Sequence, residues 1–138
     1  STSLNVDTMQ LMKQFGEKVG IAFQIKDDLF DYGKADIGKP TGNDIKEKKM
    51  TLPLIYTLNH CDKSTKNKII HIFKNAAKKK NEIKYIIDAV NASGGIHYAE
   101  NKMKTYIEEA FLLTNTLPDN EAKKYLLQLV NYSIDRKY

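Results

Sequence analysis

The most constraining feature of this sequence is a long amphipathic segment near its start, with a group of carboxylates at its far end. Apolar residues recur at intervals of three, four and seven, the spacing at which helical side chains share one face. Gly33 is a natural stop, because glycine readily adopts the left-handed conformation that ends helices. The pattern predicts one helix from about Asp7 to Tyr32, and its apolar positions are Met9, Met12, Phe15, Val19, Ala22 and Leu29.

Four polar residues lie three or four positions apart at the end of this helix, which places them in one stripe: Gln24, Asp27, Asp28 and Asp31. Like charges at this spacing repel one another, and the carboxyl end of a helix already carries partial negative charge. A bound cation would relieve both effects, and oxygen ligands favour magnesium or calcium over zinc. A solvated acidic helix end is the competing interpretation, and the stripe alone does not separate the two.

The residues that follow favour a bound cation over a solvated acidic helix end. A glycine-bounded loop, Gly38-Lys39-Pro40-Thr41-Gly42-Asn43-Asp44, carries a lysine, and more cations come before Thr51-Leu52-Pro53. Lysines placed directly after a carboxylate group suit a phosphorylated ligand that both could contact. Residues 34–50 are rich in glycine, proline and charge, so we expect them to form a loop without regular secondary structure.

These ordered motifs carry a resemblance to a known family. Phe-Gln-x-x-Asp-Asp-x-x-Asp at 23–31, Gly-Lys-Pro-x-Gly-x-Asp at 38–44 and Lys-x-Thr-Leu-Pro at 49–53 resemble the second aspartate-rich region of the trans-polyprenyl diphosphate synthases. The resemblance implies an all-α fold, the C-terminal part of an isoprenoid-synthase-type helical bundle. Residues 1–138 would then be a C-terminal fragment of a polyprenyl synthase domain. Position 48 departs from the family, because many members carry glycine where this chain has Lys48.

The resemblance also implies roles for individual residues. In the family, the aspartates of this region hold magnesium on a substrate diphosphate, and an acid in the following loop supports them. The metal-site residues by this resemblance are Asp27, Asp28, Asp31 and Asp44. The substrate-binding residues are Phe23, Gln24, Lys39 and Lys49, of which the two lysines contact the diphosphate and are the catalytic candidates.

The implied function is head-to-tail condensation of isopentenyl diphosphate with an allylic diphosphate, assisted by Mg²⁺, in a full-length protein expected to be a homodimer. The first aspartate-rich region and its paired arginines would lie upstream of Ser1, so we expect the 138-residue chain alone to be inactive. We also expect it to self-associate through an exposed face carrying Phe15, Val19 and Phe23. The alternatives are a related metal-dependent terpene cyclase and a non-enzymatic helical module that binds a divalent metal.

The composition argues against a membrane-spanning or nucleic-acid-binding protein. The mean hydropathy of −0.51 and the lack of a long apolar run predict no transmembrane helix. The net charge of +5 could suggest nucleic acid, but the run Lys78-Lys79-Lys80 has no interleaved aromatics, so we interpret it as a solvated face and expect no nucleic-acid partner. The single cysteine, Cys61, cannot form an internal disulfide, which fits a cytoplasmic protein.

The rest of the chain predicts further helices. Thr51 and Pro53 begin one that extends to about His60, and Ser64 is expected to cap the next, with Ile69, Ile72, Phe73 and Ala76 on its apolar face. Asn81 is expected to cap a short helix that ends at Gly94-Gly95, and a long helix follows from about Ile96. After a break at Pro118-Asp119, a last helix is expected to bury Ala122, Tyr125, Leu126, Leu129 and Val130.

Overall fold

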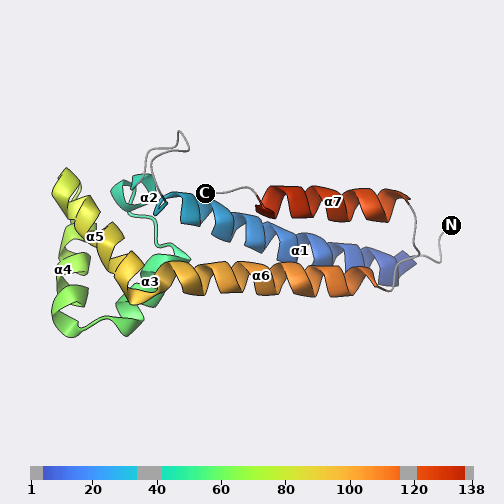
Figure 1. The fold of residues 1–138 in the computed structure, drawn as a ribbon, viewed down its shortest axis with the longest axis horizontal. Coiled ribbons are helices and arrows are strands. Elements are labelled where there is room, and N and C mark those ends of the chain that lie inside the picture. Colours follow the sequence, from blue (N-terminus) through green and yellow to red (C-terminus); the bar gives the residue numbers. More distant parts are fainter. Residues whose placement is uncertain (1–4, 34–41, 116–120, 136–138) are drawn as a thin grey trace. The chain divides into compact units, whose positions relative to one another are not determined.

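A computed structural model of the chain describes residues 5–33, 42–115 and 121–135. These residues form helices and no strands, which confirms the all-α prediction (Figure 1). The helices are α1 (Asn5–Phe30), α2 (Asn43–Lys46), α3 (Leu52–His60), α4 (Lys63–Lys74), α5 (Lys80–Ser93), α6 (Gly95–Thr114) and α7 (Glu121–Asp135). Within the described ranges, no helix combines the length and the apolar character that a membrane crossing requires.

Helix α1 begins and ends within two residues of its expected bounds. Its final residues tighten into a turn, in which the Asp31 N–H bonds to the Asp28 carbonyl at 3.2 Å and the Gly33 N–H to the Phe30 carbonyl at 3.4 Å. The apolar stripe is buried from Phe15 through Leu29, whereas Met9 and Met12, near the start of the helix, are exposed. The predicted exposure of Phe15 and Val19 is wrong, because both face the interior of the fold.

The described residues divide into two compact units, of which one comprises 25–33 and 42–101. Here α3, α4 and α5 pack against one another, as Figure 1 shows. The apolar core of this unit consists of Tyr32, Ile45, Leu54, Ile69, Ile72, Ile83, Ile86 and Val90. The two isoleucines expected on the apolar face of α4, Ile69 and Ile72, are both buried. Ala76, expected on the apolar face of α4, lies beyond the end of that helix and is exposed.

Two of the predicted helix caps are wrong. Helix α4 is capped by Asp62 and not by Ser64, because the Asp62 carboxylate accepts the N–H of Thr65 and starts the helix earlier. Helix α5 starts at Lys80, since the Glu82 carboxylate accepts the Lys79 N–H at 2.9 Å and fixes the first turn there. The expected end of α5 is confirmed: Gly94 adopts φ +87° and α6 begins at the next residue.

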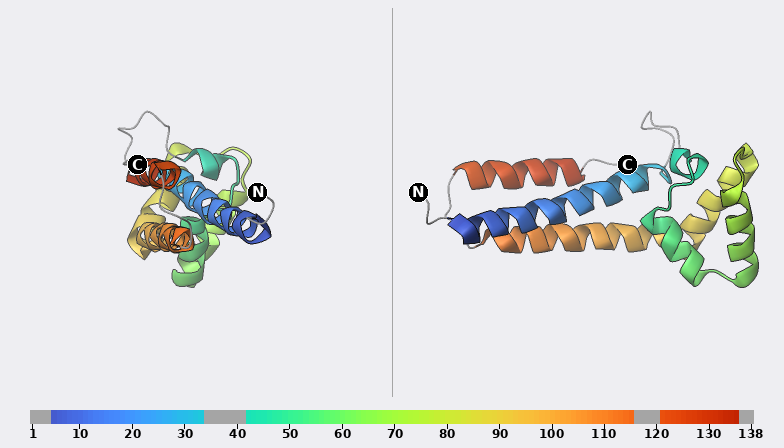
Figure 2. Two further views of the ribbon diagram at one scale, coloured as in Figure 1. Left: turned by 90° about the vertical axis from the view of Figure 1, so that its right-hand side faces the viewer. Right: turned by 180° about the vertical axis from the view of Figure 1, so that it is seen from behind.

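The other unit comprises the described residues of 5–24 and 102–135. Its parts of α1 and α6 lie side by side in Figures 1 and 2, and Lys18 of α1 forms an ion pair with Glu109 of α6 at 2.8 Å. The apolar residues of α6 and α7 that are buried in this unit are Met103, Ile107, Ala110 and Val130. Tyr125 and Leu129, expected inside, are 64% and 46% exposed. The predicted break at Pro118-Asp119 and the side chain of Ala122 lie outside the described residues.

The segment 34–50 contains one short regular element against expectation. Residues 34–41 lie outside the described part of the chain, but Asn43–Lys46 form the single turn α2. Gly42 precedes it with φ +85°, a conformation that glycine adopts without strain. The Gly42 N–H also donates to the Asp31 carbonyl at 3.1 Å, which ties the start of α2 to the end of α1.

Candidate functional site

The acidic stripe at the end of α1 divides into an inward and an outward pair. Asp28 and Asp31 are 6% and 0% exposed, whereas Gln24 and Asp27 are exposed. The division follows from helical geometry, because Asp28 and Asp31 lie three residues apart and share one side of the last turn. Phe23 is 38% exposed, so it is no core residue in this structure.

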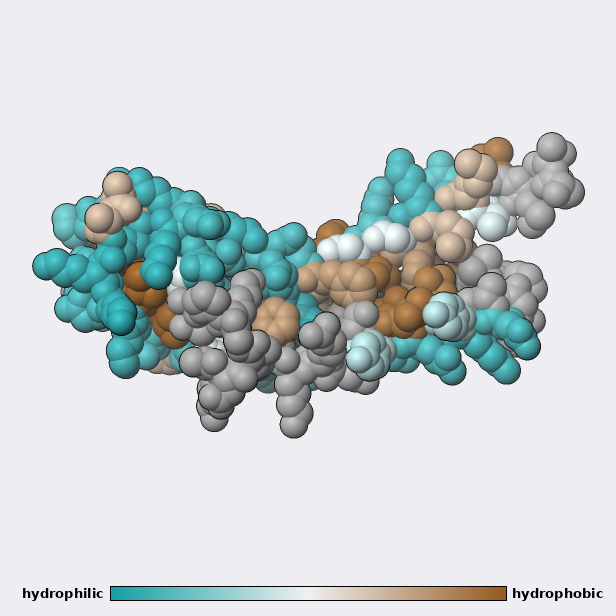
Figure 3. Space-filling model, turned by 90° about the horizontal axis from the view of Figure 1, so that it is seen from above, coloured by the Kyte–Doolittle hydropathy of each residue, from teal (hydrophilic) through white to brown (hydrophobic). Residues whose placement is uncertain are grey.

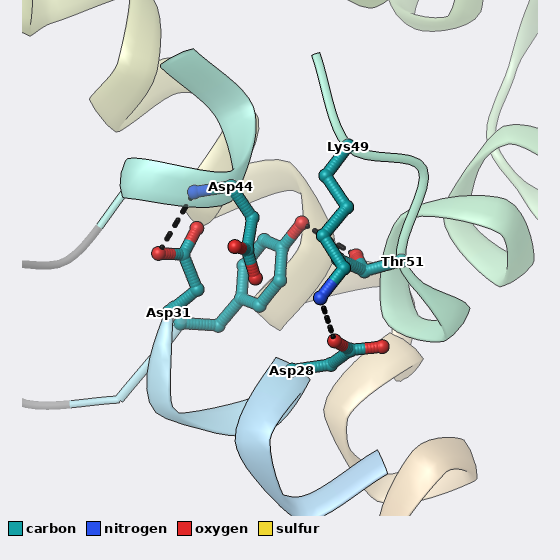
Figure 4. Close-up of polar contacts among 6 residues, drawn as sticks. Asp28, Asp31, Asp44, Lys49 and Thr51 are labelled. Carbon is teal, nitrogen blue, oxygen red and sulfur yellow. Dashed lines mark hydrogen bonds and ion pairs between the residues drawn. The ribbon is translucent and has the colours of Figure 1, made fainter. Parts of the chain in front are cut away.

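Asp28 forms an ion pair with Lys49, whose Nζ lies 3.0 Å from Asp28 Oδ1 (Figure 4). Lys49 leaves the turn after α2, where its backbone N–H donates to the Asp44 carbonyl at 2.7 Å. The hydrogen bond to Asp28 raises the pKa of Lys49 above its ordinary value. Because the Lys49 side chain is 39% exposed, the ammonium group is held in place and still reachable from solvent.

Asp31 and Asp44 meet at the other side of the site. The backbone N–H of Asp44, in the first turn of α2, donates to Asp31 Oδ1 at 3.2 Å (Figure 4). A carboxylate at a helix start is favourable, because unpaired N–H groups and the helix dipole point at it. Both residues make further interactions, and the second carboxylate oxygen of each, Oδ2, is buried.

A buried hydrogen bond between Tyr32 and Thr51 lies beside these carboxylates. The Tyr32 hydroxyl and Thr51 Oγ1 are 2.8 Å apart, and the residues are 4% and 1% exposed. Burial raises the pKa of Tyr32 well above its ordinary value, and Asp31, Asp44 and Asp28 add to the effect. Thr51 occupies the expected N-cap position of α3, but its side chain bonds to Tyr32 and makes no cap hydrogen bond.

Sequence reasoning missed this contact, although a signal was present. Tyr32 directly follows the first of the three motifs, and Thr51 is the threonine of the third, Lys-x-Thr-Leu-Pro, so this hydrogen bond connects the ends of two motifs. Lys26 was also missed; it is 5% exposed on α1, an unusual degree of burial for a lysine. Of the predicted site residues, Asp28, Asp31, Asp44 and Lys49 are brought together, and Lys39 lies outside the described residues.

The donor set suits a hard cation that is shared with a ligand. Among the described residues, no three His, Cys, Asp or Glu side chains are arranged to hold a metal by themselves. Magnesium does not require such a cage, since it keeps several waters and is commonly bound by one or two carboxylates together with substrate phosphates. Asp27 and Asp28, with oxygen donors only and Lys49 nearby, fit that mode of binding and do not fit a structural zinc site.

Comparison with known proteins agrees with this chemistry. Residues 2–90 match the family profile described as polyprenyl synthetase. The octaprenyl diphosphate synthase of Haemophilus influenzae is 30% identical over 129 residues, which are 92% of this chain and 39% of that protein. Among solved structures, a geranylgeranyl pyrophosphate synthase from Bacteroides thetaiotaomicron has a TM-score of 0.83 and 38% identity, and the match covers 92% of this chain and 42% of that one.

A second solved structure includes ligands. A geranylgeranyl pyrophosphate synthase from Corynebacterium glutamicum, complexed with calcium and isoprenyl diphosphate, has a TM-score of 0.79 and 27% identity over 94% of this chain and 40% of that one. This chain therefore spans 39% to 42% of the length of the three relatives. Because the family profile covers residues 2–90, well over half of the sequence, the chain belongs to the polyprenyl synthetase family.

Proposed function

We propose that this chain is the C-terminal part of a trans-prenyltransferase that joins isopentenyl diphosphate to an allylic diphosphate and so lengthens a polyprenyl diphosphate. The observation that carries the proposal is the Asp28–Lys49 pair, which sets a carboxylate and an accessible ammonium 3.0 Å apart within the family's motifs. The relatives named above are all prenyl diphosphate synthases, which favours chain elongation over terpene cyclisation or simple metal binding.

The proposed cation is Mg²⁺, and the residues that would hold it are Asp27, Asp28 and Asp31, with Asp44 in support. When bound, it supplies positive charge that neutralises the departing diphosphate. Asp27 is exposed and so can reach a ligand from solvent. Asp31 and Asp44 are buried, and the Asp44 N–H donates to Asp31 Oδ1, so the part of Asp44 is to hold the Asp31 carboxylate in place at the end of α1.

The lysines would orient the diphosphate. Lys49 is held by Asp28 and stays protonated at physiological pH, because its pKa is raised. A diphosphate that approaches Lys49 would share this ammonium with Asp28 and leave that carboxylate freer for the cation. Lys39 would contact the diphosphate from the loop, and Phe23 and Gln24, both exposed on α1, would line the allylic chain.

In the proposed reaction, the allylic carbon–oxygen bond breaks and the diphosphate leaves with the bonding electron pair. The double bond of isopentenyl diphosphate supplies two electrons to the allylic cation and forms the new carbon–carbon bond, and loss of a proton restores a double bond. Fixed positive charge around the leaving group lowers the barrier, since it requires no reorganisation during the reaction. We further propose that the full-length protein is a cytoplasmic homodimer, with Cys61 as a reduced thiol.

The test is a prenyl transfer assay with labelled isopentenyl diphosphate, farnesyl diphosphate and Mg²⁺. The polypeptide is a chimera in which this chain replaces the region that it matches in the Haemophilus influenzae synthase. We expect the chimera to elongate the substrate, and Asp27→Ala to reduce the rate by about a hundredfold or more without changing the melting temperature. Asp88→Ala removes an exposed carboxylate from α5 and is the matched control. Unchanged turnover in Asp27→Ala, or a folded chimera without transfer activity, would contradict the proposal.

A further inference from the structure

An apolar pocket of about 350 Å³ lies on the unit that contains α3 and α4, and none of the proposed site residues lines it. Its wall consists of six apolar side chains and two lysines: Lys48, Met50, Leu54, Leu58, Ile69, Ile70, Phe73 and Lys74. A volume of this size is in the range of pockets that hold small ligands. The apolar residues suit a hydrocarbon chain, and the lysines suit an anion.

The lysines at this pocket belong to a larger group of positive charge. Lys78 Nζ donates to the Asn75 carbonyl at 2.5 Å and lies 5.8 Å from the centre of the Phe73 ring, so Lys78 is adjacent to the pocket wall. Burial and the charge of Lys48 lower the pKa of Lys78, while the Glu82 carboxylate raises it, so Lys48 and Lys78 are close enough to repel one another. An anion between Lys48, Lys74 and Lys78 would relieve the repulsion, much as a cation would relieve the carboxylates of α1.

Lys48 has an unusual backbone conformation for its residue type. Its φ is +58°, in the left-handed region that disfavours residues with a Cβ. The residue nevertheless lines the pocket together with Met50, while Lys49 between them bonds to Asp28. Strain of this kind persists where surrounding structure enforces it, and it occurs often at ligand sites.

We propose that this pocket binds a single-chain amphiphile with a phosphorylated head group, the chain lying among the apolar residues and the phosphate between Lys48, Lys74 and Lys78. The ligand chemistry follows from the combination of an apolar cavity with two lysines in its lining. A site for a bare phosphate would not need the apolar wall, and a site for a neutral lipid would not need the lysines.

The first experiment is calorimetric titration of the 138-residue chain with octyl phosphate, below its micelle concentration and with EDTA present. EDTA removes divalent cations, so a failure of the proposed magnesium–diphosphate site cannot affect the result. We expect saturable binding of one octyl phosphate per chain, at least tenfold tighter than octyltrimethylammonium or inorganic phosphate. Equal affinity for the cationic amphiphile would overturn head-group recognition, and binding only to vesicles of anionic phospholipid would show a membrane surface instead.

Variants then locate the site. Lys48→Gln with Lys74→Gln should weaken octyl phosphate binding by about fivefold or more, as expected for the loss of two exposed charges. Lys66→Gln with Lys80→Gln removes the same charge from exposed positions of α4 and α5 that do not line the pocket, and should leave the affinity unchanged. An equal loss in both variants would overturn the proposal in favour of unspecific attraction.

A second measurement does not depend on any substitution. Methyl resonances of Met50, Leu54, Leu58 and Ile70 should shift on titration with octyl phosphate, because these residues line the cavity. The methyl groups of Val6 and Met9, exposed near the start of α1, should stay in place. Shifts confined to Val6 and Met9 would place the amphiphile elsewhere and refute the assignment.

Discussion

Gly42 lies so close to Ile83 that a Cβ at position 42 would be 2.5 Å from Ile83 Cγ2. Gly42 also has φ +85° and directly precedes α2, whose first turn carries Asp44. The second glycine of the Gly-Lys-Pro-x-Gly-x-Asp motif is therefore required for two separate reasons. One is its backbone conformation, and the other is the close packing of the loop on α5.

Gly42→Ala should destabilise the chain by about 2–4 kcal/mol, the sum of left-handed strain and a clash in a packed interior. Gly94→Ala is the matched control. Gly94 has φ +87°, but no described atom lies within 4 Å of a Cβ there, so only the strain of about 1–2 kcal/mol applies. Urea unfolding measures both. Equal losses in the two variants would show that contact with Ile83 contributes nothing.

Lys48→Gly should stabilise the chain by about 1 kcal/mol, because glycine tolerates the φ of +58° that strains lysine. The control is Lys66→Gly in the interior of α4, which should destabilise by about 1 kcal/mol through lost helix propensity. Thermal unfolding shows whether each variant is more or less stable than the wild type. A lower melting temperature for Lys48→Gly would mean that the lysine side chain has contacts that outweigh its backbone strain.

Asp28→Asn should lower the pKa of Lys49, because the hydrogen bond to Asp28 is the main cause of its increase. The pKa of Lys49 in the folded chain is above its ordinary value of 10.5. The charged lysine therefore makes its full contribution to the free energy of unfolding below pH 10.5, and this contribution is lost as the pH rises through the folded pKa. Lys49 is partly exposed, so the loss at neutral pH should be about 1 kcal/mol or less.

The measurement for this pair is an NMR titration of the lysine side chains. Asp88→Asn, which breaks the exposed Lys84–Asp88 pair, should leave the Lys49 titration unchanged. If Lys49 titrates identically in wild type and Asp28→Asn, the ion pair is not formed in solution.

Tyr32→Phe should destabilise the chain by about 1–3 kcal/mol, because it leaves the buried Thr51 hydroxyl without its partner. The double substitution with Thr51→Val should cost less than the sum of the two single ones. The pKa of Tyr32 is raised by burial, so wild-type stability should fall as the pH rises above the ordinary tyrosine value of 10.0. Tyr32→Phe should flatten this alkaline decline, and unfolding curves across that range would show whether it does.

The isolated 138-residue chain should self-associate. In the unit of residues 5–24 and 102–135, large apolar side chains are exposed, including Val6, Met9, Leu112 and Tyr132 at 66% to 74%. Apolar patches also interrupt the hydrophilic surface in Figure 3. Met9→Lys with Leu112→Lys should reduce the association measured by light scattering, whereas Lys13→Glu should not. A monomer at high protein concentration would contradict the prediction.

The sequence predicted those features that local pattern determines. The helical period of α1 correctly predicted the buried stripe from Phe15 to Leu29. The family resemblance assigned Asp28, Asp31, Asp44 and Lys49 to one site, and the structure brings these four residues together. The caps of α4 and α5 were wrong, because several polar residues in a row could each cap and only the final geometry selects Asp62 and Lys79.

Contacts between distant segments could not be predicted in this way. The hydrogen bond of Tyr32 to Thr51 and the approach of Gly42 to Ile83 depend on how the loop packs, and no periodicity encodes that. Tyr125 and Leu129 were expected to be buried because they fit an apolar stripe along α7, and both are exposed. A stripe in the sequence does not show whether another element packs against that face. The roles of Asp27 and Lys39 in binding remain predictions.

The packing of α3, α4 and α5 has a consequence for how the molecule assembles. These helices are consecutive in the chain and pack on one another, so their contacts close short loops at little entropic cost. Helical units with such local contacts fold in microseconds to milliseconds. Asp28 and Lys49 are 21 residues apart, and Lys18 and Glu109 are 91 apart. The three-helix core should therefore form first and hold Lys49 near its final place before the end of α1 arrives with its carboxylates.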